Sequence, residues 1–277
     1  MNSVTITYFC NLLYKINIIL KQTDYFMTNG FYCEFIQPEK QIAEFVENIG
    51  MFHNPSDEAK EVVVLPDGRI DLFFMKTGSE PFITILLGLE TEAEQRSIPP
   101  DTIAFAVSFR PLAVEYILRT SIADLLNSGK NLNDDSWNLN DDDLKDLEIF
   151  TQKITAKIRA RLPEAVDERK SRLFELIYSS NGETSVKELS EKTGWSSRQI
   201  NRYFTQQFGL SLKAYSTILR FRASLQHIAE GKLFPELNFA DQTHFIKEIK
   251  KFSGVAPKEL SKNKNDRFIL LSVLKEK

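Results

Sequence analysis

The stretch from Ser185 to Pro257 constrains the fold of this 277-residue chain more than any other part of it. Val186 and Leu189 share one face of a short helix, at a spacing of about one helical turn. Gly194 follows, and glycine readily takes the left-handed conformation at which helices end. Ser196 can then cap a second helix through its hydroxyl. A helix, a glycine turn and a capped helix in succession are typical of a helix-turn-helix unit.

The second helix of this unit has two unlike faces. This helix is expected to end at Gly209, directly after the apolar Phe208, because glycine readily takes the left-handed conformation of a helix C-terminus. A helix that lies in the major groove of DNA needs polar side chains on its outer face, because base edges and phosphates are polar. The apolar face carries Ile200, Tyr203, Phe204 and Phe208, and the polar face carries Arg198, Gln199, Asn201, Arg202 and Gln206.

Residues beyond the first unit complete a wider pattern. The first unit contributes Leu189, Gly194, Ser196, Ile200, Arg202, Phe204, Phe208-Gly209, Ser211 and Tyr215; the following helix contributes Leu219-Arg220, Arg222-Ala223 and Leu225; a second unit contributes the run from Asn238 to Phe245 with Phe252, Gly254 and Pro257. On these residues the stretch resembles the DNA-binding region of the AraC/XylS family of bacterial transcription regulators, in which a long helix joins two helix-turn-helix units. The resemblance covers roughly the last third of the chain and implies an activator or repressor in the cytoplasm, with double-stranded DNA as its partner.

The second unit departs from the family pattern in two ways. Asn238 stands where the family has glycine, and asparagine is the next-best residue for a left-handed turn. Between Ala223 and Asn238 the chain is about four residues short, which is about one helical turn. Residues 231–237, which include Pro235, occupy the place of the first helix of this unit, so we expect that helix to be truncated or replaced by a turn. The sequence leaves open whether the second unit reads DNA.

The resemblance places base-facing and phosphate-facing side chains on both second helices. Arginine can bind guanine in a bidentate manner and asparagine can bind adenine, whereas lysines neutralise phosphates. The candidates are Ser197, Arg198, Gln199, Asn201 and Arg202 in the first unit, and Gln242, Thr243, His244, Lys247, Lys250 and Lys251 in the second.

Several of these residues have an alternative interpretation. Arg202 could be a solvated or ion-paired helix residue, and Asn201 a neutral surface residue. His244 could hold the turn by a hydrogen bond inside its unit instead of contacting a base. Trp195, at the turn, is interpreted as a core anchor rather than a base-stacking group.

The charge of the chain is divided unevenly between its two parts. Residues 1–167 hold 15 Lys+Arg against 26 Asp+Glu, a net charge of −11, whereas residues 168–277 hold 20 against 12, a net charge of +8. A basic part suits a polyanion such as DNA and an acidic part does not. With 42% hydrophobic and 11% aromatic residues, the chain is predicted to form packed cores in two domains.

The N-terminal part is predicted to be rich in β-structure. The spacing of apolar residues predicts a helix over residues 38–52. Residues 61–65 and 69–75 are predicted strands that form a hairpin across the turn Pro66-Asp67-Gly68, and residues 81–89 and 101–109 are two further strands. Four strands without intervening helices favour an antiparallel sheet or a small barrel. A helix is expected from Pro111 to Leu118, with the helical pattern continuing over residues 122–126.

This part also resembles, more weakly, the sensor-like domains that precede AraC-type DNA-binding regions. The residues concerned are Leu65-Pro66-Asp67-Gly68, Asp71, and Phe109-Arg110-Pro111. The resemblance implies a small, cupin-like β-rich domain that senses a small-molecule effector or mediates contact in a homodimer. The alternative is that Pro-Asp-Gly is only a hairpin turn and Arg110 only a surface cation.

The connection between the two parts is acidic and then helical. Residues 131–146 are predicted to be a surface connection, and a helical stripe from Leu144 to Leu162 is expected to pack on its own domain or on a second subunit. The predicted fold class is α+β: a small β-rich domain, either a cupin-like barrel or a sheet with flanking helices, followed by an all-α double helix-turn-helix domain. The predicted divisions are a peripheral extension (1–30), the sensor-like domain (31–130), the connection and linker helix (131–166), the DNA-binding domain (167–265) and a C-terminal tail (266–277). The extension would be explained if Met1 is encoded by a start codon upstream of the native one.

Other classes of function find little support in the sequence. The histidines are His53, His227 and His244, and the cysteines Cys10 and Cys33 have no metal-ligand spacing, so neither an enzyme nor a metal or other cofactor is predicted. No apolar run reaches the ~18–20 residues of a membrane span. The remaining alternative to a DNA-binding regulator is a protein-interaction module that keeps the helix-turn-helix fold without reading bases.

Overall fold

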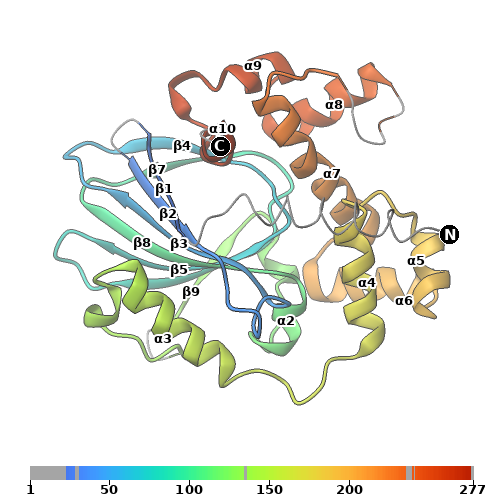
Figure 1. The fold of residues 1–277 in the computed structure, drawn as a ribbon, viewed down its shortest axis with the longest axis horizontal. Coiled ribbons are helices and arrows are strands. Elements are labelled where there is room, and N and C mark those ends of the chain that lie inside the picture. The colour runs from blue at the N-terminus through green and yellow to red at the C-terminus, as the bar shows by residue number, and fades with distance from the viewer. Residues whose placement is uncertain (1–22, 29–30, 134–135, 235–238, 240, 276–277) are drawn as a thin grey trace, which may run out of the picture.

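The computed structural model describes residues 23–28, 31–133, 136–234, 239 and 241–275. Figure 1 shows the strands gathered in one part of the molecule, with the helices from α4 to α9 beside them. The predicted α+β class is confirmed, and of the two architectures foreseen for the first domain it is the sheet with flanking helices that is present. Within the described residues, no helix combines the length and the apolar character that crossing a membrane requires.

Two antiparallel sheets form the N-terminal domain. The larger has the strand order β1-β2-β3-β8-β5-β6-β9, and the smaller pairs β4 with β7. The bounds are β1 Thr23–Thr28, β2 Phe31–Ile36, β3 Val46–Asn54, β4 Lys60–Val64, β5 Ile70–Thr77, β6 Ile83–Leu87, β7 Glu94–Ile98, β8 Thr102–Phe109 and β9 Gly129–Leu132.

The larger sheet presents two different faces because side chains alternate along each strand. On β5, Ile70, Leu72 and Phe74 are buried on one face. Helix α3 (Leu147–Arg159) covers that face, and its Phe150 ring lies 5.5 Å from Phe74 and 5.0 Å from Phe105 of β8 between ring centroids. The apolar stripe of α3 is therefore buried within its own chain, which was one of its two predicted partners.

The helix predicted over residues 38–52 is wrong. Residues 40–45 form turns, in which the Val46 amide donates to the Ile42 carbonyl at 2.9 Å, and β3 begins at Val46. The pairing of β3 with β8 shifts register between Val46 and Asn48. Such a bulge lets Val46 and Ile49 both point inward, three positions apart, and so imitates helical spacing.

The predicted hairpin across Pro66-Asp67-Gly68 is also wrong, although the turn itself exists with Gly68 at φ 77°. β4 pairs with β7, whereas β5 pairs with β6 and β8, so this segment crosses from one sheet to the other. β7 was not predicted because its sequence, EQRSI, is mostly polar. The region expected to be a peripheral extension contains β1, which pairs with β2.

The rest of the described chain is mainly helical. The segment expected to be a surface connection is partly inserted into the core, since Trp137 and Leu144 are 4% and 6% exposed. The helices not yet introduced are α2 Leu112–Tyr116, α4 Glu168–Ser179, α5 Val186–Thr193, α6 Ser197–Phe208, α7 Leu212–Ala229, α8 Gln242–Ser253, α9 Pro257–Lys262 and α10 Ile269–Lys275, with 3-10 turns at Ala123–Leu125, Asp141–Leu144 and Lys264–Asp266.

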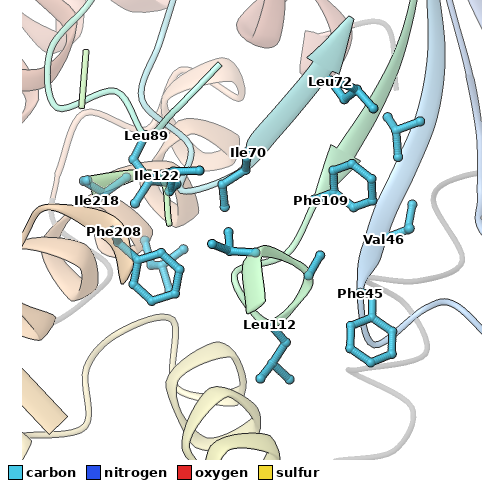
Figure 2. Packing of buried hydrophobic residues seen from close by; sticks show 14 of the residues in the cluster. Phe45, Val46, Ile70, Leu72, Leu89, Phe109, Leu112, Ile122, Phe208 and Ile218 are labelled. Atoms are coloured by element: carbon cyan, nitrogen blue, oxygen red, sulfur yellow. The ribbon is translucent and has the colours of Figure 1, made fainter. Parts of the chain in front are cut away.

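One hydrophobic core runs across the boundary between the two parts. Figure 2 shows Phe208 and Ile218, from α6 and α7, lying beside Leu89 and Ile122 of the N-terminal part. Because this contact is apolar and fully buried, we expect the two parts to move as one body rather than as independently tethered domains.

Candidate DNA-binding surface and internal cavity

The first helix-turn-helix unit is fixed by a cap at each helix end. The Ser185 hydroxyl accepts a hydrogen bond of 3.2 Å from the Glu188 amide at the start of α5, and Gly194 ends that helix at φ 67°. Ser196 and Gln199 then form a capping box. The Ser196 hydroxyl accepts from the Gln199 amide at 3.3 Å, and the Gln199 side chain accepts from the Ser196 amide at 2.9 Å. The predicted turn and cap are confirmed, and they set the angle at which α6 leaves the turn.

Helix α6 is held by its apolar face. Phe174 of α4 lies against Phe204 and Phe208, with ring centroids 5.6 Å and 6.2 Å apart. The Trp195 ring lies 5.4 Å from Tyr203 and is partly buried, which agrees with its interpretation as a packing residue. The helix therefore projects its opposite face away from the protein.

The candidate DNA contacts of α6 differ in how available they are. Arg198 and Arg202 are exposed. Ser197 and Asn201 are partly buried, and the Asn201 amide donates to the Ser197 carbonyl at 3.0 Å. The side-chain oxygen of Gln199 is engaged in the capping box. The two arginines are thus the side chains best placed to reach outward.

The second unit is built around α8. The Asp241 carboxylate caps it by accepting from the His244 amide at 2.7 Å, and Gly254 ends it in the left-handed conformation. The His244 side chain is exposed, and its ring lies 5.9 Å from that of Phe239. Phe245, Ile249 and Phe252 are buried, whereas the candidates Gln242, Thr243, His244, Lys247, Lys250 and Lys251 are all exposed.

The shortened segment of the second unit is not helical where it is described. Between the end of α7 at Ala229 and the start of α8 at Gln242, the described residues 230–234, 239 and 241 form turns and irregular structure. Pro235 and Asn238, on which the sequence argument relied, lie outside the described residues.

Two domain families match the chain. Residues 189–263 match the family described as a helix-turn-helix domain, and residues 34–130 match one described as a domain of unknown function (DUF6597). The C-terminal part of the chain is an AraC-type helix-turn-helix domain. No protein with a curated description matches the sequence.

Among solved structures, ToxT from Vibrio cholerae is similar at low identity. An apo variant from strain SCE256 is 11% identical with a TM-score of 0.42, and the match covers 80% of this chain and 97% of that one. ToxT from strain O395 is 13% identical with a TM-score of 0.40, covering 81% and 96%. The same protein bound to (E)-4-(8-methylnaphthalen-1-yl)but-3-enoic acid is 14% identical with a TM-score of 0.41, covering 92% and 100%.

The AraC-type domain is bound tightly to the β-rich domain through α7. The Tyr215 hydroxyl donates to the Gly68 carbonyl at 3.0 Å. Arg222 forms an ion pair with Glu47 and also donates to the Asp67 carbonyl at 3.3 Å. Burial alone would raise the pKa of Glu47, but Arg222 and neighbouring guanidinium groups lower it to about 2.

A cavity of about 390 Å³ lies between the two sheets of the β-rich domain. Its floor is the face of β8 that carries the short, buried side chains of Thr102, Ala104, Ala106 and Ser108, which alternate with larger side chains on the opposite face and leave space. Its size is within the usual range of small-molecule sites, about 300–1,000 Å³. The apolar lining includes Phe35, Phe52, Val62, Val64, Leu65, Phe73, Met75, Ile85 and Leu87.

The C-terminal tail supplies part of the wall of this cavity. Ile269 and Leu270 of α10 line it. The tail is attached to β4 by a hydrogen bond of 2.6 Å from the Val63 amide to the Arg267 carbonyl. The 3-10 turn at Lys264–Asp266 links α9 of the AraC-type domain to α10, so one short segment joins the cavity to that domain.

The charged side chains of the cavity come from β5, β7 and the turn before β5. Arg69 pairs with Asp67, and Arg96 pairs with Glu94 at 2.6 Å. Asp71 also lines the cavity, and burial raises its pKa to about 6 although Arg69 and Ser108 oppose the shift. Asp67 and Asp71 belong to the segment on which the weaker sensor-domain resemblance rested. Arg69 lies next to that segment, whereas no local signal pointed to Arg96, which comes from the distant strand β7.

Proposed function

We propose that this protein is a sequence-specific, DNA-binding transcription regulator whose β-rich domain senses a small molecule in the cavity between its two sheets. The observation that supports it most directly is α6, a capped second helix of an AraC-type domain that exposes Arg198 and Arg202. Regulators of this type are not enzymes, and we assign the chain no catalytic role.

Both reading helices can serve one DNA molecule. α6 ends shortly before α7 begins, and α8 packs beside α7 through Phe252, whose ring lies 5.1 Å from that of Phe221. Both helices are therefore attached to the same helix of one chain. In this proposal Arg198 and Arg202 of α6 and Thr243 and Lys247 of α8 contact bases, while Lys250 and Lys251 contact phosphates.

The sensing function is supported by the shared position of the cavity and the interface. Asp67 and Arg69 line the cavity, and Gly68 between them accepts the hydrogen bond of Tyr215. A ligand that moves this turn acts on α7, and one that moves α10 acts on the second unit. Ligand binding can therefore change the affinity for DNA, because the turn and α10 connect the cavity directly to the helix-turn-helix domain.

The second candidate function is a protein-interaction module that does not read bases. It is favoured by the absence of helix in the described residues between Ala229 and Gln242. The salt dependence separates the two functions, because a DNA-binding protein loses affinity steeply as salt rises.

A monomer already carries two reading helices, so the proposal does not require a homodimer. We place the protein in the cytoplasm, where DNA is the polyanion available to its basic part. Light scattering with and without DNA would measure the number of chains in each complex.

The test is fluorescence anisotropy with duplexes from upstream of the protein's own gene, with random duplex as competitor, at two salt concentrations. Arg202→Ala is expected to weaken specific binding by about 1–3 kcal/mol. The control is Arg159→Ala, which removes an exposed arginine at the end of α3, in the N-terminal part of the chain. Weak and equal binding to every duplex, unchanged by Arg198→Ala and Arg202→Ala, would exclude α6 as a DNA reader.

A further inference from the structure

The cavity is apolar over most of its surface but has one end rich in charge. Asp71 stands on the cavity face of β5, directly opposite Ser108 of β8. Phe73 and Met75 follow it on the same face and continue the apolar wall. A molecule that fills this space must therefore be largely apolar, with one polar group at the Asp71 end.

Asp71 has an unused hydrogen-bonding atom there. Its Oδ1 is buried and has no hydrogen-bond partner among the residues that the structure describes. Leaving such an acceptor unpaired costs free energy, and the cost is larger for a charged group than for a neutral one. Buried polar groups are normally paired, so an exception that faces a cavity marks a place where a ligand can supply the missing donor.

The nearby arginines form ion pairs with other acids, although the buried Nε of Arg96 has no hydrogen-bond partner among the described residues. The Arg69 Nε donates to the Asp67 carboxylate at 2.7 Å. The Arg96 guanidinium lies between Glu94, at 2.6 Å, and Glu90, at 3.4 Å. Neither arginine forms an ion pair with Asp71 among the described residues.

The pairing of charges at this end therefore leaves Asp71 without a cation of its own. Asp67 is paired with Arg69, Glu94 with Arg96, and Glu47 with Arg222, which also donates to the Asp67 carbonyl. Burial raises the pKa of Glu90 to about 8, so this group is mostly neutral at pH 7, while Asp71, with a pKa of about 6, is mostly ionised. An ammonium group at the Asp71 Oδ1 would balance the charge of this carboxylate, whereas a ligand carboxylate there would place a second negative charge beside it.

We propose that the cavity binds a small, mostly apolar primary amine, whose ammonium group donates a hydrogen bond to Asp71 while its apolar body lies on Ala104, Ala106 and Phe73. This identifies the chemical class of the effector and in that sense rests on the sensing role proposed above. The binding itself involves no DNA and can be measured separately.

Four probes with the same apolar body test the head group. They are 4-phenylbutylamine, 4-phenylbutan-1-ol, 4-phenylbutyrate and butylbenzene, titrated into the full-length protein at pH 7.5 by calorimetry or by ligand-detected NMR. The amine is expected to bind at least about tenfold more tightly than the alcohol, as a hydrogen bond to a charged group implies. The carboxylate is expected to bind most weakly of the four.

Two variants assign the preference to its residue. Asp71→Asn should remove the preference for the amine over the alcohol and leave the affinity for butylbenzene unchanged, which also shows that the cavity is intact. Asp57→Asn, an exposed acid on the turn before β4, is the matched control and should behave as the native protein. Equal binding of all four probes, tightest binding of the carboxylate, or an amine preference that persists in Asp71→Asn would overturn the proposal. Because no DNA is present, these outcomes are independent of whether the protein reads DNA.

Discussion

The hydroxyl of Tyr215 lies 3.0 Å from the carbonyl oxygen of Gly68 and 3.0 Å from the hydroxyl of Tyr178. Tyr215 belongs to α7, the helix that joins the two helix-turn-helix units, and Gly68 belongs to the turn that leads from the smaller sheet to β5. The neighbours of Gly68 in sequence, Asp67 and Arg69, line the cavity. One three-residue turn is therefore part of the proposed sensor site and of the interface with the AraC-type domain.

Replacing Tyr215 by phenylalanine tests this connection. The change removes the bond to Gly68 and leaves a buried carbonyl unpaired, so the free energy of unfolding should fall by about 1–3 kcal/mol. Tyr178→Phe is the control, because it keeps the Gly68 bond and should lose less. Urea denaturation measures both. Equal losses in the two variants would show that the hydrogen bond to Gly68 adds nothing to stability beyond the bond between the two tyrosines.

The ion pair between Glu47 and Arg222 is the second link across the interface. Removing one partner of this partly buried pair leaves the other charge uncompensated, so Glu47→Gln should lower the free energy of unfolding by about 1–3 kcal/mol. The double variant Glu47→Gln, Arg222→Met should lose less than the sum of the two single variants. Strict additivity in this double-mutant cycle would mean that the pair contributes no coupling.

The same pair predicts a dependence on pH in the acid range. The pKa of Glu47 is about 2, below the ordinary 4.5, so ionisation of this carboxylate stabilises the folded state above about pH 4.5. That stability is lost as the pH falls from about 4.5 towards 2. Glu47→Gln lacks the titrating group and should lose less stability than the native protein between pH 5 and pH 3. An equal loss would contradict the assignment.

Glu90 predicts the opposite trend at higher pH. Burial, with Asp67 and Asp71 nearby, raises its pKa to about 8, although Arg96 opposes the shift. A raised pKa of an acid stabilises the folded state at low pH, and this contribution is lost as the pH rises from about 4.5 through about 8. Glu90→Gln should therefore gain melting temperature over the native protein at pH 9 more than at pH 5. The exposed control Glu92→Gln should show no such difference.

The helical part of the fold could be predicted from the sequence because its signals are local. Gly194, Ser196 and Gly209 act on the helix that they end or begin, within a few residues, and each does so in the structure. The exposed arginines of α6 follow from the same pattern, because the apolar face of the helix fixes the opposite one. Their contact with DNA remains a prediction.

The β-rich part could be predicted only in outline, because a strand is completed by a partner far away in the chain. The partner of β4 is β7, about thirty residues later, and a bulge at Val46 gave β3 the spacing of a helix. The cavity depends on β5, β7, β8 and α10 together, so no single segment reveals it. The alternation of small residues from Thr102 to Ser108 was the one local sign of a space beside β8.

The role of α10 as a cavity wall predicts a purely apolar effect. Leu270→Ala shortens a lining side chain and should weaken binding of 4-phenylbutylamine and of butylbenzene by a similar factor, on the order of fivefold, because only apolar contact is lost. Leu274→Ala, on the same helix but outside the lining, is the control. Calorimetry with both probes measures the factors. A loss confined to the amine would mean that Leu270 acts through Asp71 instead.

The contribution of the second unit to DNA binding can be measured from its lysines. If Lys250 and Lys251 of α8 each neutralise a phosphate, the double variant Lys250→Ala, Lys251→Ala should reduce the slope of log affinity against log salt by about 1.8, at about 0.9 for each lost contact. Both side chains are exposed, so the fold should be unaffected. The control is Lys145→Ala, Lys153→Ala, which removes two exposed lysines from the N-terminal part and should leave the slope unchanged. Anisotropy titrations at four salt concentrations supply the slopes. A slope unchanged by the α8 variant would mean that α8 does not lie on DNA, and would limit base reading to α6.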